Sequence, residues 1–256
     1  MKYLNVLQGL RLIKNKREVI KHLFNLNEKK LIKYELKNKI KFLVPNLKKN
    51  RSTILSINEI FKQEIYPIKE SNEERLILDI GAQSGIFSIY ALYRNNNAKI
   101  YSFEPDPENF IQLKENIKEN KLDKNIYPIN KAVSGKNGKI SFYIHLKSSR
   151  ANSIYKEDGQ RIEVESITLE KVFADLKIKK CDILKIDIEG AEYDTLYNCP
   201  RDILNKINII FIECHEYSNI NKIYNKKSMI KFLSKNNFKV LKENEGIIIL
   251  KNKGKQ

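Results

Sequence analysis

LILDIGAQSG, residues 76–85, is the stretch that decides the fold of this chain. Its first three residues form a short apolar run, which is typical of a strand buried on both faces. Asp79 lies at the end of that strand, and Gly81 and Gly85 occupy the turn before an apolar helical pattern begins. A strand, a glycine-containing turn and a helix in this order start a nucleotide-binding βαβ unit.

The glycine spacing of this turn, D-x-G-x-x-x-G, differs from the G-x-G-x-x-G fingerprint of dinucleotide enzymes. Fewer glycines are needed where no pyrophosphate is bound, and the carboxylate can then receive a cationic or hydroxyl-bearing ligand. The turn alone also fits an ordinary connection that happens to contain two glycines, so the rest of the chain has to decide.

From residue 76 onward the apolar pattern alternates between strand and helix, which predicts an α/β fold with a mostly parallel, doubly wound sheet. Asp106 and Pro107 are the expected N-cap and first residue of one helix. The expected strands are 76–80, one ending at Glu104, 125–133, an antiparallel excursion at 139–145, 162–167, 181–188, 207–213 and a terminal antiparallel hairpin at 238–250. The expected helices are 85–94, one from 107, 168–176, 191–197 and 227–233, with a polar loop at 147–160.

Residues 1–75 are expected to form a basic, mainly helical N-terminal extension, and residues 76–256 the Rossmann-like domain. Apolar residues from Leu4 to Phe24 recur near helical spacing, with lysines and arginines between them. Such a helix can lie on an anionic membrane, or it can pack on the rest of the chain or on a second subunit of a homo-oligomer. Packing is the favoured interpretation, and His22 is expected at the surface.

The chain has 256 residues and a net charge of +17, of which the first 75 residues carry +10. This asymmetry indicates a nucleic acid, an anionic membrane surface or an acidic substrate, although the spread of the lysines also fits a solvated surface. Three cysteines without a C-x-x-C pair argue against a disulfide framework and a thiolate zinc site, and they fit a cytoplasmic protein. The chain shows neither a membrane span nor a signal peptide.

Carboxylates follow four of the expected strands. Asp79, Glu104 and Glu213 each end a strand, and Asp187 and Glu189 follow the strand in KIDIEGAE. Ligands of doubly wound sheets bind at the carboxyl ends of the strands, where such a carboxylate can accept from ribose hydroxyls. Glu104 follows Gly85 by 19 residues, close to the offset expected for that ribose contact, although an acid before a helix is also favoured on electrostatic grounds.

His215 follows the strand 207–213 in the sequence IECHEY. A neutral histidine can remove a proton from a hydroxyl, and this one can alternatively join Asp187 and Glu213 as a ligand of a divalent metal. A histidine satisfied at a strand end is the third interpretation. Glu192 and Asp194 lie in the first turn of a helix, where acids are favoured anyway, so we expect them to be structural.

Taken together, these motifs resemble the FkbM family of S-adenosylmethionine-dependent methyltransferases. The similarity runs in order across about residues 76–216. It rests on LDIGAQSGIFS, FEPDPENFIQLKENIKEN, INKAVSGKNGKISFY, ITLEKVF, DILKIDIEGAEYDTL and IIFIECHE. KIDIEGAE is the most specific of these stretches. Gln83 stands where the family more often has Asn, which is a change between two amides.

The resemblance implies a Rossmann-like methyltransferase fold and an O-methyltransferase acting on hydroxyls, often of sugars in glycolipids, polysaccharides or glycosylated metabolites. Asp79, Gly81 and Gly85 would hold the methionine end of S-adenosylmethionine, and Glu104 would hold its ribose. The Asn130–Ala132 region, with Lys131 and Ala132, would border the adenine. Asp187, Glu189 and His215 would face the acceptor.

Two other functions remain as alternatives. The net charge suggests a nucleic-acid methyltransferase acting on RNA, but no RNA-binding module and no N/D-P-P-Y/F motif is present in the sequence. A nicotinamide dehydrogenase is disfavoured by the glycine spacing. The basic extension further suggests peripheral contact with the inner face of the membrane.

Overall fold

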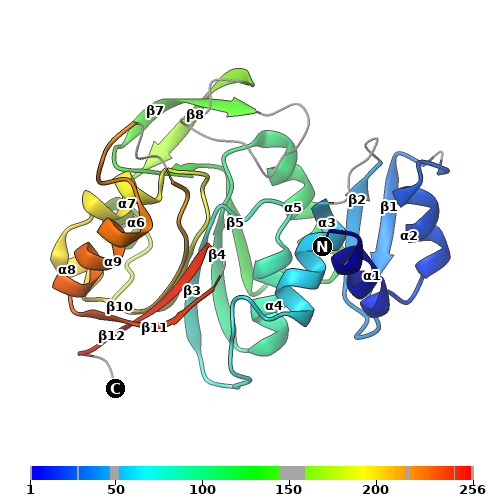
Figure 1. Ribbon diagram of the computed structural model, residues 1–256, viewed down its shortest axis with the longest axis horizontal. Helices are drawn as coiled ribbons and strands as arrows, with labels where there is room; N and C mark the ends of the chain where they lie inside the picture. Colours follow the sequence, from blue (N-terminus) through cyan, green and yellow to red (C-terminus); the bar gives the residue numbers. More distant parts are fainter. Residues whose placement is uncertain are drawn as a thin grey trace.

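The computed structural model describes residues 2–27, 29–46, 52–144, 159–216, 220–244 and 246–254, so most of the predicted loop at 147–160 lies outside the described residues. A seven-stranded sheet with the order β11-β12-β10-β9-β3-β4-β5 forms its centre (Figure 1). Its strands are β3 (Arg75–Ile80), β4 (Ala98–Phe103), β5 (Ile126–Ile129), β9 (Cys181–Ile186), β10 (Ile207–Glu213), β11 (Phe238–Glu243) and β12 (Ile247–Asn252).

The five strands from β5 to β10 run parallel, whereas β12 pairs antiparallel with both β10 and β11. The chain builds outward from β3 through β4 to β5, and then returns to place β9 and β10 on the other side of β3. The strand order therefore reverses between β3 and β9, and a doubly wound sheet binds its ligand at such a switch point. The mostly parallel sheet with a terminal antiparallel hairpin is confirmed.

Helices cover both faces of the sheet (Figure 1). The helices α4 (Ile86–Arg94) and α5 (Pro107–Glu119) share one apolar cluster with one face of the sheet, and α7 (Glu192–Tyr197) and α9 (Lys226–Lys235) share a second cluster with the other. The second cluster also includes α6 (Leu169–Asp175) and α8 (Arg201–Leu204). The predicted cap of α5 is confirmed, because the Asp106 side chain accepts from the backbone N–H of Glu108 at 2.8 Å, ahead of Pro107.

The predicted strand at 125–133 is two strands in two sheets. After β5 the chain turns, and β6 (Ala132–Val133) pairs parallel with β8 (Gln160–Ile167), which pairs antiparallel with β7 (Gly138–Ile144). The Asn130 side chain donates to the backbone carbonyl of Glu104 at 2.8 Å, which fixes the turn between β5 and β6. This turn carries residues 130–132 past the carboxyl end of β4 and to the edge of the ligand site.

The N-terminal segment is helical at both ends but contains a β-hairpin that the sequence analysis did not predict. Its elements are α1 (Lys2–Leu12), α2 (Lys16–Leu23), β1 (Leu31–Glu35), β2 (Lys41–Pro45), α3 (Ser52–Ile57) and the π-helical turn η1 (Asn58–Lys62). The alternating burial of β1 is visible in its sequence, LIKYE, because a strand buries every second side chain. None of the helices in the described residues is both long and apolar enough to cross a membrane.

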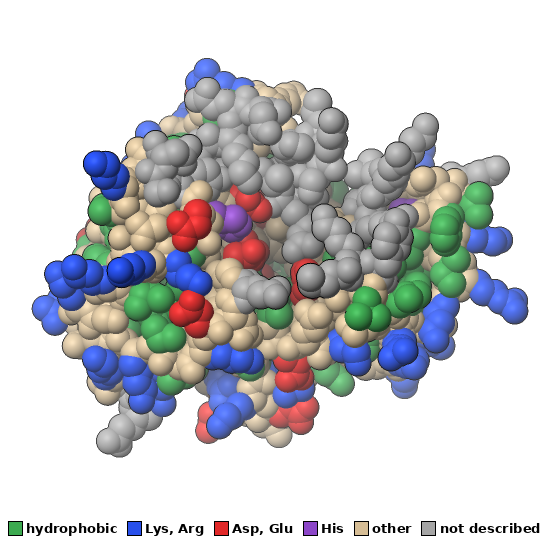
Figure 2. All heavy atoms as spheres, viewed as in Figure 1, with side chains coloured by type: hydrophobic (Ala, Val, Ile, Leu, Met, Phe, Trp, Pro, Cys, Tyr) green, Lys and Arg blue, Asp and Glu red, His purple; other side chains and the backbone are tan. Residues whose placement is uncertain are grey.

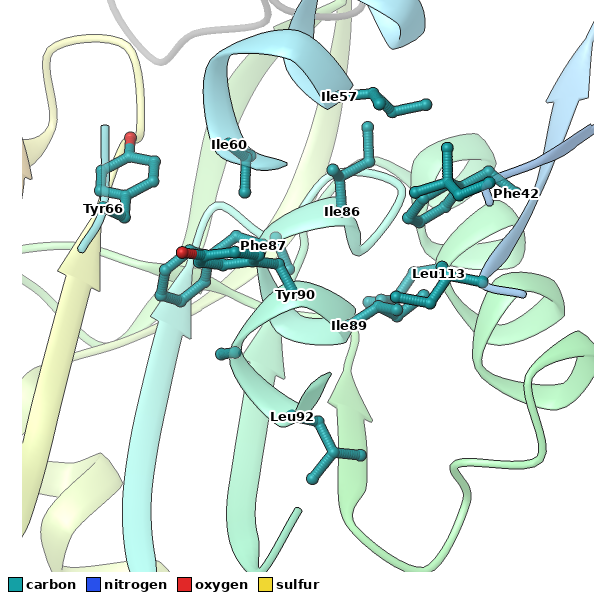
Figure 3. Close-up of a cluster of buried hydrophobic side chains, with 14 of the residues drawn as sticks. Phe42, Ile57, Ile60, Tyr66, Ile86, Phe87, Ile89, Tyr90, Leu92 and Leu113 are labelled. Carbon is teal, nitrogen blue, oxygen red and sulfur yellow. The ribbon is translucent and has the colours of Figure 1, made fainter. Parts of the chain in front are cut away.

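The N-terminal segment packs on α4 and α5, as the favoured interpretation predicts. Phe42, Ile57 and Ile60 meet Ile86 and Leu113 in one continuous cluster (Figure 3). The prediction for His22 is wrong: the side chain is buried, with Nδ1 2.9 Å from the Tyr34 hydroxyl. The domain boundary near residue 76 stays a prediction.

Asn116 of α5 and Asn120, the C-cap of that helix, bind the hairpin through its backbone. Asn116 accepts from the N–H of Leu43 at 2.7 Å, and Asn120 accepts from the N–H of Lys41 at 2.9 Å. The same Asn116 side chain donates to the carbonyl of Ser84, in the turn after β3, at 2.8 Å. One buried amide therefore joins the N-terminal hairpin to the ligand-binding turn.

Candidate functional site

Two adjoining cavities lie at the carboxyl ends of β3, β4, β9 and β10, and Gly81, Gln83 and Asp187 line both. The larger has a volume of about 610 Å³, which is within the range of small-molecule sites. Figure 2 shows acidic side chains and a histidine gathered in a hollow on the viewed face. The strand ends therefore converge as the sequence predicts, and the roles of the residues there stay predictions.

The turn after β3 requires glycine at position 81. Gly81 has φ of +80°, and a Cβ there would lie 1.9 Å from the backbone carbonyl oxygen of Asp187. Gly85, with φ of +84°, serves packing instead, since a Cβ would lie 2.6 Å from a Leu113 methyl carbon, and Gly85 lines neither of the two cavities. Of the two predicted cofactor glycines, Gly81 is the one that lines the two cavities.

Asp79 lies behind that turn rather than in a cavity. Its carboxylate is fully buried, accepts from the Ser88 hydroxyl at 2.6 Å and lies 3.2 Å from Nζ of Lys185. Its carboxylate is turned toward Ser88 of α4 and Lys185 of β9, and the expected contact between Asp79 and the cofactor stays a prediction. Asp79 therefore holds Ser88 and Lys185 in position behind the turn.

Lys185 is a site residue that the sequence analysis missed. Its buried ammonium donates to the Gly81 carbonyl at 2.7 Å and lies 3.7 Å from the Asp187 carboxylate. Burial disfavours its charge, but Asp79 and Asp187 outweigh burial and raise the pKa of Lys185, so the group is a cation. A lone lysine inside the apolar strand CDILKI was the available signal, because such a charge needs buried partners.

Glu104, Lys131 and Ala132 line the smaller cavity together, as predicted from separate segments. The Glu104 carboxylate accepts from the backbone N–H of Gln83 at 2.8 Å and of Asp106 at 2.9 Å. Burial is the main reason why the pKa of Glu104 is raised to about 7. The remaining wall includes the apolar side chains of Phe103, Val133 and Phe142.

His215 lies among carboxylates at the end of β10. Its Nδ1 is 2.9 Å from Oε1 of Glu192, and its Nε2 is 3.6 Å from Glu189 and 4.0 Å from Glu213. Burial acts to lower the pKa of His215, but the hydrogen bond to Glu192 and the surrounding negative charges raise it to about 9. Glu192 lies in the first turn of α7 as expected, and its buried carboxylate also positions the His215 ring.

Asp187, Glu213 and His215 also form a group that fits a metal ion. One ligand atom from each residue lies within 4.8 Å of the others. Glu192 binds the far nitrogen of the imidazole, as the outer partner of a metal-binding histidine does. The geometry is thus compatible with both predicted roles of His215, proton acceptor and metal ligand.

The N-terminal segment supplies much of the wall of the larger cavity, which no motif of the sequence predicted. The side chains that it places along the cavity are mostly polar in and around α1 and η1, and an aromatic residue, Tyr66, follows η1. The lining residues from this segment are Asn5, Ser56, Glu59, Ile60, Gln63, Ile65 and Tyr66.

A doubly wound sheet with its last strand antiparallel, and a carboxylate-lined cleft at the switch point, define a Rossmann-like enzyme domain that binds a small nucleotide-like ligand. The sequence model of the family "Methyltransferase FkbM domain" matches residues 79–240. The chain belongs to this family and is a methyltransferase, and S-adenosylmethionine is the methyl donor that membership implies. The predicted family is confirmed.

Two characterised relatives are also methyltransferases. The hexuronic acid methyltransferase AglP of Haloferax volcanii is 24% identical over 64% of this chain and 70% of its own length. The methyltransferase sdnD of Sordaria araneosa is 25% identical over 63% of this chain and 74% of its own length. A solved FkbM methyltransferase from Methylobacillus flagellatus aligns with a TM-score of 0.49 and 11% identity, over 79% of this chain and 55% of that one.

Proposed function

We propose that this methyltransferase transfers the methyl group of S-adenosylmethionine to a hydroxyl of a sugar in a glycan, glycolipid or glycosylated metabolite. The observation that carries the proposal is the larger cavity, where polar N-terminal side chains face Asp187 and Glu213 across an open space of about 610 Å³. A sugar needs a site with many hydrogen-bonding side chains, and AglP, a relative, is named for methylation of hexuronic acid.

The smaller cavity fits the adenosyl part of the donor. Glu104 offers carboxylate oxygens for a ribose diol, and Phe103, Val133 and Phe142 offer apolar surface for a base. Gly81 lines both cavities, and its lack of a Cβ lets the turn after β3 pack against the backbone of Asp187. Together these residues would hold S-adenosylmethionine, whose sulfonium supplies an already activated methyl group.

The acceptor side needs alignment and removal of one proton. Asn5, Ser56 and Gln63 are placed to orient an acceptor in the larger cavity. His215 Nε2 is our candidate for the proton acceptor, because Glu192 holds its other nitrogen and leaves Nε2 toward the carboxylates of the site. Asp187, which lines both cavities, is the alternative base. Fixed alignment of this kind can supply several kcal/mol of the barrier, about 7 or more in favourable cases.

A second candidate role for Asp187, Glu213 and His215 is to hold a divalent cation. Two carboxylates and an imidazole suit Mg²⁺ or Mn²⁺, and such an ion lowers the pKa of a bound hydroxyl. Chelation with EDTA separates the two roles. Methyl transfer that persists in EDTA assigns removal of the proton to a side chain, whereas activity that is lost in EDTA and restored by Mn²⁺ assigns a metal ion to the site. Binding of Mn²⁺ followed by electron paramagnetic resonance, in the chain and in Glu213→Gln, tests the site without any turnover.

The decisive experiment follows the label from S-adenosylmethionine carrying a radioactive methyl group. Glycolipid, polysaccharide and RNA fractions of the source cell are each incubated with the chain, with and without His215→Asn. Label in a sugar that survives mild base supports O-methylation of a sugar. Label in RNA would overturn the proposal in favour of the alternative that the net charge of +17 suggests.

The cofactor assignment is tested by isothermal titration with S-adenosylhomocysteine. Glu104→Ala should weaken binding at least about tenfold, because a ribose contact by a charged hydrogen bond contributes about 1.5–3 kcal/mol. Glu108→Ala is the matched control, since Glu108 is an exposed acid four residues further along. Equal affinity of the two variants would contradict the ribose role.

A further inference from the structure

Large apolar side chains are exposed on the N-terminal segment although the segment has a buried face of its own. We define the N-terminal apolar patch as Leu4, Leu7, Ile20, Phe24, Leu26 and Leu31. Their exposed fractions range from 40% to 71%. Exposed apolar residues are common singly, but a group within one short segment marks an interaction surface.

The arrangement of these residues explains why they stay exposed. Leu4 and Leu7 lie one turn apart on α1, and Ile20 and Phe24 are four residues apart at the end of α2. On their other sides, α2 buries Val19 and Leu23, and α1 packs partly buried apolar residues such as Leu10 against the same cluster. Each helix therefore uses one face for the core and presents a second apolar stripe outward.

The patch is surrounded by positive charge. Residues 1–35 contain nine lysines and arginines against three glutamates, a net charge of +6. Arg11, Arg17 and Lys21 are exposed on the same two helices. Three of the other lysines form ion pairs, Lys14 with Glu35, Lys29 with Glu18 and Lys33 with Glu119, and the segment still carries a surplus of positive charge.

The patch lies beside the entrance to the larger cavity. Asn5, between the two exposed leucines of α1 in sequence, lines that cavity. Figure 2 shows green side chains over α1 and α2 on the same face as the acidic hollow, with blue side chains near them. A surface that binds the patch would therefore lie next to the point where an acceptor enters.

We propose that the N-terminal apolar patch docks on the surface of a bilayer that contains anionic phospholipid. Leucine and phenylalanine side chains enter the boundary of the acyl chains, while the surrounding lysines and arginines bind the headgroups. Pairing of the patch with a second copy would bring two surfaces of charge +6 together, which is repulsive, so the charge favours an anionic surface over self-association. With the proposed function, this docking presents a lipid-linked acceptor to the cavity.

The test is co-sedimentation of the full chain with sucrose-loaded vesicles, without donor or acceptor. Vesicles of phosphatidylcholine with about 30% phosphatidylglycerol should pellet the protein, and pure phosphatidylcholine should pellet at least about tenfold less. Added salt should weaken binding, since about 1 M salt shortens the Debye length to about 3 Å. Because no turnover is measured, failure here leaves the sugar methylation proposal standing.

The variant Phe24→Ser with Leu26→Ser should reduce binding to the anionic vesicles at least about tenfold, because each buried CH₂ contributes about 0.8 kcal/mol. Ile111→Ser is the matched control, since Ile111 is an equally exposed apolar residue on α5, away from the patch. Circular dichroism and the melting temperature establish that all three proteins are folded. Equal binding by the double variant and the wild type would overturn the proposal.

Self-association is measured on the same proteins by analytical ultracentrifugation. A dimer that the double variant abolishes, combined with no vesicle binding, would assign the patch to a second copy and overturn membrane docking. If docking delivers the acceptor, anionic vesicles should raise activity toward a lipid-linked sugar and leave activity toward a water-soluble one unchanged.

Discussion

Replacing Glu192 by Gln should shift the pH dependence of methyl transfer to lower pH. Glu192 is fully buried, its Oε1 is 2.9 Å from Nδ1 of His215, and the same oxygen accepts from the N–H of Ile188 at 3.0 Å. A glutamine has the same shape, and its carbonyl oxygen can keep both hydrogen bonds. The substitution therefore removes one negative charge and little else.

The size of the shift follows from the charges around the imidazole. Glu192 is the strongest of the groups that raise the pKa of His215 to about 9, and Glu189 and Asp187 contribute after it. Without the carboxylate the pKa should fall toward its ordinary value of 6.5. At pH 7 the neutral fraction of the imidazole would rise from about 1% to at most about three quarters. The imidazole with the lower pKa is also a weaker base and accepts a proton less readily, so the maximal rate can fall. The pH at which the rate levels off is therefore the diagnostic quantity.

The assay is kcat measured between pH 6 and 10, in EDTA and with saturating donor and acceptor. In the wild type kcat should rise about tenfold per pH unit and level off near pH 9, because only the neutral imidazole accepts a proton. In Glu192→Gln the curve should level off at clearly lower pH, whereas Glu170→Gln, an exposed acid on α6, should match the wild type. A wild-type profile that is flat from pH 7 to 9, or identical profiles for both variants, would refute His215 as the base.

Three further predictions concern stability, each measured as the free energy of unfolding in urea. Gly81→Ala should lower the free energy of unfolding by more than about 3 kcal/mol, because the added Cβ would lie 1.9 Å from a backbone oxygen. Gly138→Ala is the control and should cost only about 1 kcal/mol, because Gly138 has φ of +106° but open space around it. Similar losses in the two variants would show that the turn after β3 can shift to accommodate a Cβ. Lys185→Met should lower the free energy of unfolding by about 3–5 kcal/mol, because Asp79 is left buried without its cation. Adding Asp79→Asn to this variant should recover part of the loss. No recovery would show that the two groups are energetically independent. Because the pKa of His215 is raised to about 9, its charged form stabilises the fold fully below pH 6.5, and this contribution should disappear as the pH rises through about 9. The difference in free energy of unfolding between the wild type and His215→Asn should therefore shrink over that interval. A constant difference would contradict the raised pKa.

The sequence predicted the sheet and the meeting of carboxylates because those signals are local. A buried apolar run, a glycine turn and a capped helix can each be recognised within a dozen residues, and parallel strands bring their carboxyl ends to one edge. Glu104 and Asp187 line the cavities for this reason, and His215 lies beside Glu189 and Glu213, while the roles of all three residues stay predictions. The strand predicted at 125–133 failed because the division between β5 and β6 depends on which sheet each half joins.

What the sequence could not supply were contacts between distant segments. In the sequence Lys185 is an isolated charge in an apolar strand, and only the structure shows that Asp79 of the neighbouring strand is its ion-pair partner. Glu192 looks like an ordinary acid in a first turn until β10 brings His215 to it. Asp79 matched a motif whose spacing does not reveal which way the carboxylate faces, and its burial appears only in three dimensions.

The amide of Asn116 has a consequence for redesign of this enzyme. Because it binds both Leu43 in the hairpin and Ser84 in the turn after β3, the hairpin and this turn rest on one shared anchor. A chimera that exchanges only residues 1–75 with those of a relative would leave this anchor facing an unfamiliar strand. Grafting the hairpin together with α5 would keep Asn116 with Leu43, and its bond to position 84 needs only a backbone carbonyl, which the receiving chain supplies.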